Sequence, residues 1–285
     1  MELTATLQDL GLPSDVLLWQ ALLLTIISFG VGIVGGFVGL ALGTVRLPVL
    51  LFLGMPSTLA AGTNIIVSTA SSLFGALRHM REGRVDLRVV LIMGVPSFAG
   101  AFLGGYYAGA APEGLLVLVV GILVLWQGIE LAAKAGAAAE SSGAPGGAMA
   151  DALAGGTDRR RHPALAAAMG LVIGVTGGAV GLILGSLRLP GLIRVLGMDP
   201  RIAAGTNLFI GFAMGASGWT GHVARGQVDY SLAVLMGLSA VAGVNIGARQ
   251  TGRAGLRTLL ASMGAVLIVV GVLMAWRGVD GWLLR

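Results

Sequence analysis

Two arginines lie inside glycine-rich segments that are otherwise apolar, and they are the first candidates for chemistry. Arg46 and Arg188 each stand two positions before a proline, and neither segment contains Asp or Glu. A charged side chain at membrane depth usually faces a cavity or marks a ligand pathway, and a guanidinium can donate paired hydrogen bonds to an oxyanion. The pattern therefore indicates an anion site. The alternative is that both arginines mark loop ends and extend to lipid headgroups.

Polar and small residues near each arginine occur in both segments and could complete such a site. Hydroxyl and amide groups come from Thr44, Thr63, Asn64, Ser186, Thr206 and Asn207. Polar pairs of this kind also hold membrane helices together, so both roles stay open. Glycines that could bring backbone close to a substrate are Gly35, Gly36, Gly177 and Gly178. Close helix packing alone is expected for Gly100, Gly104, Gly243 and Gly247.

Two histidines and two aspartates also stand at equivalent positions. His79 and His222 follow the second and sixth apolar runs. A histidine can titrate near neutral pH and couple transport to protons, although an interfacial histidine is more often simply solvated. Asp86 and Asp229 precede the next apolar runs, where we expect each to cap the following helix.

Several classes of chemistry are excluded by what the sequence lacks. It has no cysteine and three histidines without a zinc-binding spacing, so we expect no metal site. No nucleophile–base pair falls at membrane depth, which argues against an enzyme. No Gly-Lys-Ser/Thr sequence is present, so ATP is not the direct energy source. We therefore expect no cofactor, and coupling to protons or sodium stays open.

The composition is that of a helical membrane protein. Of 285 residues, 56% are hydrophobic and 11% charged, against roughly a quarter charged in soluble domains. Runs of 19 to 31 residues without a charge are long enough for membrane-spanning helices and too long for β-barrel strands. The excess arginines lie mainly between these runs, where they orient helices in lipid, so nucleic acid is not an expected partner.

The chain contains an internal duplication. Gly36, Arg46 and Pro48 recur 142 positions later, and Gly62, Thr63 and Asn64 recur 143 positions later. We predict an all-α polytopic protein of two tandem four-span repeats, about eight transmembrane helices, with broken or re-entrant segments after spans 1 and 5. These short segments are 47–54 and 189–197. The predicted divisions are a lead-in 1–15, a first repeat 16–133, a flexible linker 134–162, a second repeat 163–277 and a tail 278–285.

Four spans per repeat is an even number, so the two halves should share one orientation, related by an axis along the membrane normal. A half-segment that crossed the membrane would reverse this argument. With eight crossings, eleven basic residues lie on the side of the termini and seven on the other. The positive-inside rule then predicts cytoplasmic termini in a multi-pass cell-membrane protein. The lead-in carries no Lys or Arg, so the first span should remain in the mature protein.

The doubled motif resembles the TauE/SafE-type sulfite exporter family. The resemblance covers about residues 16–277 and rests on Gly35-Gly36 with Arg46-Leu-Pro48, on Ala60-Ala61-Gly62-Thr63-Asn64, and on their copies at 177–190 and 203–207. It implies an exporter of a small oxyanion such as sulfite, sulfoacetate or another organosulfonate across the cell membrane. The implied partners are that oxyanion and membrane lipid. The oligomeric state stays open, a homodimer included.

Other functions fit the same spans. An anion channel or a transporter of a different small substrate would fit the same fold, and a membrane-embedded enzyme is a more distant alternative. A cation transporter would normally use carboxylates within the membrane, and the core spans lack them.

Overall fold

The long uncharged runs form helices, because a helix satisfies its backbone polar groups internally where lipid offers no partner. The computed structural model describes residues 5–38, 43–140, 163–249 and 256–283, and the named elements within these ranges are all helical. Five helical stretches are long and apolar enough to cross a membrane: Ser57–Arg81, Leu87–Ala110, Glu113–Ala133, Pro163–Val180 and Gly264–Gly281. The predicted polytopic helical membrane protein is thereby confirmed, and the count of eight spans stays a prediction.

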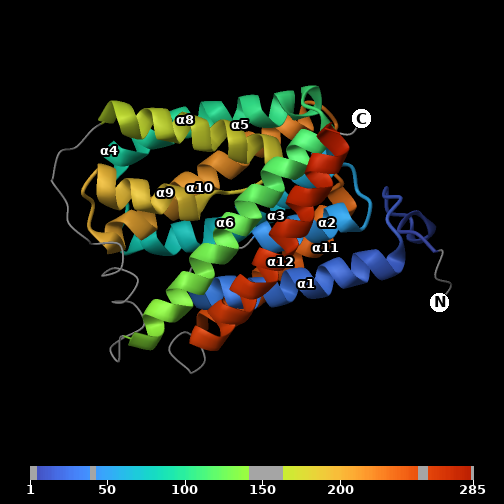
Figure 1. Ribbon diagram of the computed structural model, residues 1–285, viewed down its shortest axis with the longest axis horizontal. Helices are drawn as coiled ribbons and strands as arrows, with labels where there is room; N and C mark the ends of the chain where they lie inside the picture. Colours follow the sequence, from blue (N-terminus) through green and yellow to red (C-terminus); the bar gives the residue numbers. More distant parts are fainter. Residues whose placement is uncertain (1–4, 39–42, 141–162, 250–255, 284–285) are drawn as a thin grey trace.

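The first half begins with a short 3-10 turn, η1, which is followed by helices of unequal length (Figure 1). Its elements are η1 (Gln8–Leu10), α1 (Leu18–Val38), α2 (Gly43–Phe52), α3 (Ser57–Arg81), α4 (Leu87–Val89), the π-helical turn η2 (Val90–Gly94), α5 (Val95–Tyr107), η3 (Ala108–Ala110) and α6 (Glu113–Glu140). Helix α6 continues seven residues beyond the predicted end of the first repeat at 133. The rest of the predicted linker, 141–162, lies outside the described residues.

The second half has corresponding elements in the same order. They are α8 (Pro163–Val180), α9 (Gly185–Pro190), the π-helical turn η4 (Gly191–Val195), α10 (Pro200–Val223), α11 (Tyr230–Arg249) and α12 (Leu256–Leu283). Asp86 accepts hydrogen bonds from the backbone N–H groups of Arg88 and Val89, and Asp229 accepts one from Leu232. Both aspartates therefore cap the following helices, which confirms that prediction.

The predicted helix break after span 5 lies earlier than the sequence indicated. In the second half the chain leaves α8 at Gly181, where φ is +70°, and residues 182–184 are buried without helical structure. Arg188 follows inside α9, and Pro190 is the last residue of that helix. In the first half Pro48 lies inside α2. The two arginines therefore belong to short helices, and the Arg-x-Pro sequence is not itself the break.

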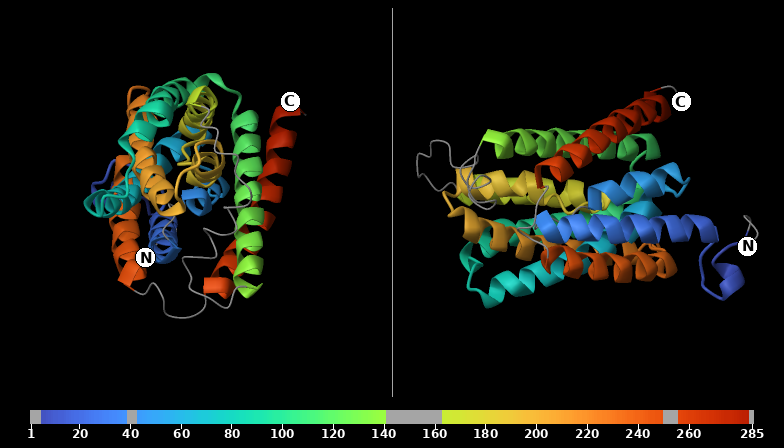
Figure 2. Two further views of the ribbon diagram at one scale, coloured as in Figure 1. Left: turned by 90° about the vertical axis from the view of Figure 1, so that its left-hand side faces the viewer. Right: turned by 90° about the horizontal axis from the view of Figure 1, so that it is seen from below.

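Equivalent helices of the two halves run antiparallel. Between α3 and α10, Gly75 faces Leu208, whereas Ile65 faces Gly218. Helices α6 and α12 pack along one another in the same antiparallel way (Figure 2). The prediction that the halves share one orientation is therefore wrong. The physical reason is that α2 returns the chain to the face where α1 began, and α9 with η4 does the same for α8.

Helices also pair between the halves, α1 with α11 and α5 with α8. Glycines make these contacts close: a Cβ on Gly32 would meet the backbone of Ala240, and one on Gly100 would meet that of Leu171. Gly104 and Gly243 are equally enclosed by backbone of the neighbouring helix. The packing role expected for these glycines is confirmed, except for Gly247, whose surroundings lie outside the described residues.

The two ends of the molecule carry different numbers of basic residues. We call the end where α1 begins and α12 ends the terminal face, and the end where α6 ends and α8 begins the linker face; Figure 1 shows them at the right and left. Described helices and loops place at the linker face Arg78, Arg81, Arg84, Arg88, Lys134, Arg194, Arg201, Arg249 and Arg257. At the terminal face they place Arg225 and Arg277. The count of basic residues that predicted cytoplasmic termini therefore loses its support, because five of its seven described members lie at the linker face, opposite the termini.

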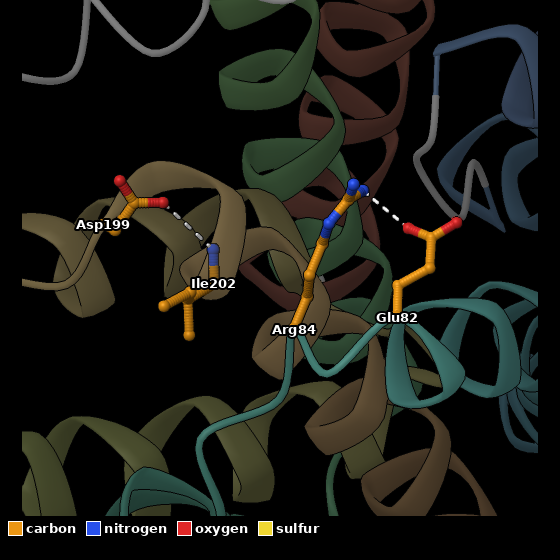
Figure 3. A network of polar contacts seen from close by, with 4 residues as sticks. All are labelled: Glu82, Arg84, Asp199 and Ile202. Carbon is orange, nitrogen blue, oxygen red and sulfur yellow. Dashed lines mark hydrogen bonds and ion pairs between the residues drawn. The ribbon is translucent and has the colours of Figure 1, made fainter.

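At the linker face, the loop after α3 packs against the start of α10. Arg84 forms an ion pair with Glu82 at 2.6 Å, and Asp199 accepts a hydrogen bond from the backbone N–H of Ile202 at the start of α10 (Figure 3). A Cβ on Gly205 would collide with the carbonyl of Arg84. The loop of the first half therefore rests directly on the first turns of α10.

Candidate functional site

Arg46 is 1% exposed and is held by two side chains of α3. Its Nε donates to Asn64 Oδ1 at 3.3 Å, and one terminal nitrogen donates to Ser68 Oγ at 2.9 Å. The amide of Asn64 donates in turn to the carbonyl of Gly181, in the break after α8, at 2.9 Å. The guanidinium thus belongs to a network that links α2, α3 and the second half.

Arg188 is fully buried, and one of its two hydrogen bonds goes to a sulfur and not to an oxygen. Its Nε donates to Asn207 Oδ1 on α10 at 2.8 Å, and Nη1 lies 3.4 Å from the sulfur of Met214, a weak acceptor. Asn207 is itself oriented by a hydrogen bond to the carbonyl of Gly185 at 3.1 Å. Nη2 of Arg188 has no partner. An unmet buried donor costs about 1–3 kcal/mol, more on a charged group, so this nitrogen marks a position where a ligand atom would be stabilising.

A small cavity of about 20 Å³ lies beside Arg188. Its lining joins both halves: Ser72, Gln127, Ile183, Gly185, Ser186, Arg188, Asn207, Leu208 and Gly211. The hydroxyl of Ser72 is buried without a partner, like Nη2 of Arg188. The cavity therefore brings unused hydrogen-bond donors of α3 and α9 to one place.

Neither guanidinium has a carboxylate partner among the described residues. The ion pair seen in that part of the chain, between Glu82 and Arg84, lies at the partly exposed linker face. A buried charge without a counter-ion is expensive. A bound anion would supply the missing charge, so the electrostatics of the core favour an anionic ligand.

The two threonines predicted to face the cavity instead make matched contacts between the halves. Thr63 Oγ1 accepts a hydrogen bond from the backbone N–H of Asp229 at 3.0 Å, and Thr206 Oγ1 accepts one from Asp86 at 2.9 Å. Both threonines are fully buried. These contacts correspond to the alternative role of polar residues as links between helices.

The other residues predicted for the site are divided between packing and the cavity. Ser186 lines the cavity, and the Thr44 hydroxyl is buried without a partner. Gly177 and Gly178 lie against backbone carbonyls of Leu182 and Ala101, so they serve close packing. Gly35 and Gly36 lie in α1, but their surroundings fall outside the described part of the chain.

The two histidines lie away from the cavity, near the ends of α3 and α10. The ring nitrogens of His222 lie 2.8 Å from the carbonyl of Gly178 and 3.0 Å from Gln227 Oε1. His79 lies beside Gly205 at the equivalent place. His222 thus connects the end of α10 to α8 and to the following loop. Its place in proton coupling stays a prediction, as does that of His79.

Three polar residues near the arginines were missed by the sequence analysis. Ser68 and Ser72 lie within a serine-rich and threonine-rich helix, and Gln127 lies in the fourth apolar run. A signal for Gln127 existed, because an isolated polar side chain in a membrane span usually faces the protein interior. Ser72 carried no such signal, because its neighbours on α3 are also small and polar.

Comparison with known proteins gives one consistent family. The model of the family described as "Sulfite exporter TauE/SafE" matches residues 24–274. The "Probable membrane transporter protein YunE" of Bacillus subtilis (strain 168) is 25% identical over 267 residues, which cover 90% of this chain and 98% of that protein. "Probable membrane transporter protein YdhB" of the same strain is 26% identical, over 81% of this chain and 90% of its own. "Probable membrane transporter protein ORF9" of Sinorhizobium sp is 24% identical, over 82% and 83%. No solved structure gives a significant match.

Proposed function

The chain belongs to the TauE/SafE sulfite exporter family, and from that premise we propose that it is a secondary transporter of a small oxyanion. Sulfite, sulfoacetate and other organosulfonates are the proposed substrates, moved outward across the cell membrane. The observation that carries the proposal is the pair of buried arginines without carboxylate partners among the described residues, one of which has an unused N–H beside a cavity.

The chemistry of the core favours an anion over other ligands. Arginine remains charged and presents several N–H groups in a plane, which suits the oxygens of a sulfite or sulfonate group. The cavity lining contains hydroxyl and amide groups and no carboxylate or histidine. A cation would find no counter-charge there, and an enzyme would find no acid–base pair.

We further propose that the two halves are inverted repeats of four spans each, with α2 and α9–η4 as returning segments. The observations behind this are the antiparallel pairs α3–α10 and α6–α12 and the short lengths of α2 and α9. About ten helical residues extend 15 Å, half of a hydrocarbon core. In transporters with inverted repeats, substrates bind near the midplane between the halves, beside interrupted helices. The cavity beside Arg188 is lined by residues of both halves and lies next to the break before α9, which supports a substrate site there.

The charge of the two faces supports a definite orientation. The positive-inside rule places the face with more Lys and Arg in the cytoplasm, and among described residues that is the linker face. We therefore propose that both termini lie on the outer side of the cell membrane. This reverses the orientation predicted from the sequence while keeping both termini on one side.

A flux measurement tests the proposed function. Purified protein in liposomes should release trapped sulfite or sulfoacetate faster than empty liposomes, and the rate should saturate with concentration. Imposed proton and sodium gradients should show which ion, if either, drives the flux. The double variant Arg46→Met with Arg188→Met should lose the saturable component while remaining monodisperse. Equal rates from protein-containing and empty liposomes with all oxyanions tried would refute the proposal.

A further inference from the structure

The two buried arginines differ in one hydrogen bond to a side-chain oxygen, and a single residue position explains the difference. In the first half, Ser68 accepts a hydrogen bond from a terminal nitrogen of Arg46 at 2.9 Å. The position 143 residues further on is Gly211, which has no side chain to offer Arg188. Nη2 of Arg188 lies near Gly211, since a Cβ built there would be 3.4 Å away, and has no partner. Arg46 thus donates to two side-chain oxygens, whereas Arg188 donates to one oxygen and one thioether sulfur and has a buried Nη2 without a partner.

Polar residues contributed by the opposite half show the same asymmetry. Ser72 and Gln127, from the first half, line the cavity beside Arg188. At the same offset the second half has Gly215 and Val270, so it has no equivalent groups to place beside Arg46. Among the described residues, the first half therefore places beside Arg188 two polar side chains for which the second half has no equivalents.

We propose that the oxyanion binds at one site, beside Arg188, and that Arg46 is its structural counterpart, which fastens α2 to α3. This inference rests on the proposed function and assigns the contacts within it. Nη2 of Arg188, the hydroxyls of Ser72 and Ser186 and the amide of Gln127 donate to the anion oxygens. Asn207 is a positioning residue, because its Oδ1 holds Nε of Arg188 at 2.8 Å.

The size of the cavity adds a conformational requirement. A volume of about 20 Å³ holds about one water molecule, which is less than a whole sulfite ion needs. Binding therefore requires the walls formed by Ile183 and Leu208 to separate, moving α9 and the preceding break relative to α10. Anion binding at Arg188 is in this way coupled to movement of the short helix, as alternating access between repeats requires.

The substitution Gly211→Ser tests the site by giving Arg188 the partner that Arg46 already has. The new hydroxyl would occupy the space beside Nη2, and the nearest other atom, a methyl of Ile183 at 3.0 Å from the added Cβ, must shift by a few tenths of an ångström. We expect affinity for sulfite, measured by titration calorimetry on purified protein, to fall about ten-fold or more, because a charged hydrogen bond is replaced. Gly237→Ser is the matched control, since a Cβ there meets nothing within 4 Å.

A second pair of variants keeps the test decisive if Gly211→Ser does not fold. Ser72→Ala removes an unpartnered hydroxyl from the cavity and should weaken sulfite binding by about three- to ten-fold. Ser71→Ala, one position away, removes a hydroxyl that donates to the carbonyl of Val67 at 3.0 Å and should change affinity by less than two-fold. Sulfite binding that is unchanged by Ser72→Ala and Gly211→Ser would overturn the Arg188 site and leave the proposed function standing. A wild-type protein that binds neither sulfite nor sulfoacetate would overturn both.

Discussion

Each buried arginine can be replaced by methionine in turn. We expect the Arg188→Met variant to be the more stable of the two and yet to lose transport. Arg188→Met removes a fully buried charge, an unpartnered N–H, the hydrogen bond to Asn207 and a weak one to the sulfur of Met214. Arg46→Met removes the same charge together with hydrogen bonds to both Asn64 and Ser68. The two variants therefore differ mainly in how well the lost guanidinium was bonded.

The magnitude follows from those contacts. Relief of an unpartnered buried donor is worth about 1–3 kcal/mol, and one additional hydrogen bond to a charged group about 1.5–3 kcal/mol. The charge itself costs about 2.5–3.5 kcal/mol at mid-membrane on insertion scales and cancels in the comparison. Arg188→Met should thus be more stable than Arg46→Met by roughly 2.5–6 kcal/mol in free energy of unfolding. It should also lose saturable sulfite flux, because the proposed anion contact is gone.

Equilibrium unfolding in mixed detergent micelles, followed by the fluorescence of the five tryptophans, measures this difference. The same preparations in liposomes give the flux. A free energy of unfolding for Arg188→Met equal to or below that of Arg46→Met would refute the reasoning, since it would mean that the second guanidinium is as fully satisfied as the first. Retained flux in Arg188→Met would separately contradict the site.

Two further predictions concern how the halves are joined and how the protein lies in the membrane. Thr63→Val leaves the buried backbone N–H of Asp229 without its acceptor, and Thr206→Val does the same to the partly buried N–H of Asp86. Each should lower the free energy of unfolding, Thr63→Val by about 1–3 kcal/mol and Thr206→Val by less, in the same micelle assay; a change below about 0.3 kcal/mol in both, well under the usual value of a hydrogen bond, would contradict the inter-half role. The chain has no cysteine, so single cysteines report topology directly. An impermeant thiol reagent added to intact cells should label Leu10→Cys at the terminal face and not Arg81→Cys at the linker face, and the reverse pattern would refute the proposed orientation.

The inverted arrangement shows where counting spans from a sequence fails. Five of the predicted apolar runs form helices long enough to cross a membrane, and short helices follow α1 and α8, although each begins earlier than predicted. Whether each repeat crosses the membrane an odd or an even number of times, however, depended on whether those segments return the chain to the face it came from. A helix of ten residues such as α2 is half a membrane thick, so its direction is set by its contacts with α3 and not by its length.

Some of the residues around the cavity and the two arginines were likewise predicted from the sequence. Its charged members, Arg46 and Arg188, and their asparagine partners were predicted because a repeated polar residue in an apolar segment is conspicuous. The difference between the two arginines was not predicted. It depends on Ser68 in one half and Gly211 in the other, and a missing side chain has no signature in a hydropathy pattern.

The sequence by itself determined that this is a duplicated helical membrane protein of the TauE/SafE type with a pair of arginines in its core. These properties follow from local information: the length of uncharged runs, the offset between copies and the types of residue within them. Only the tertiary structure decided that the halves are inverted and that, among the described residues, Arg188 combines an unused N–H with donors from the other half. Ser72 and Gln127 are more than sixty residues from Arg188 along the chain, and packing of α3, α6 and α9 around one cavity is what brings them together.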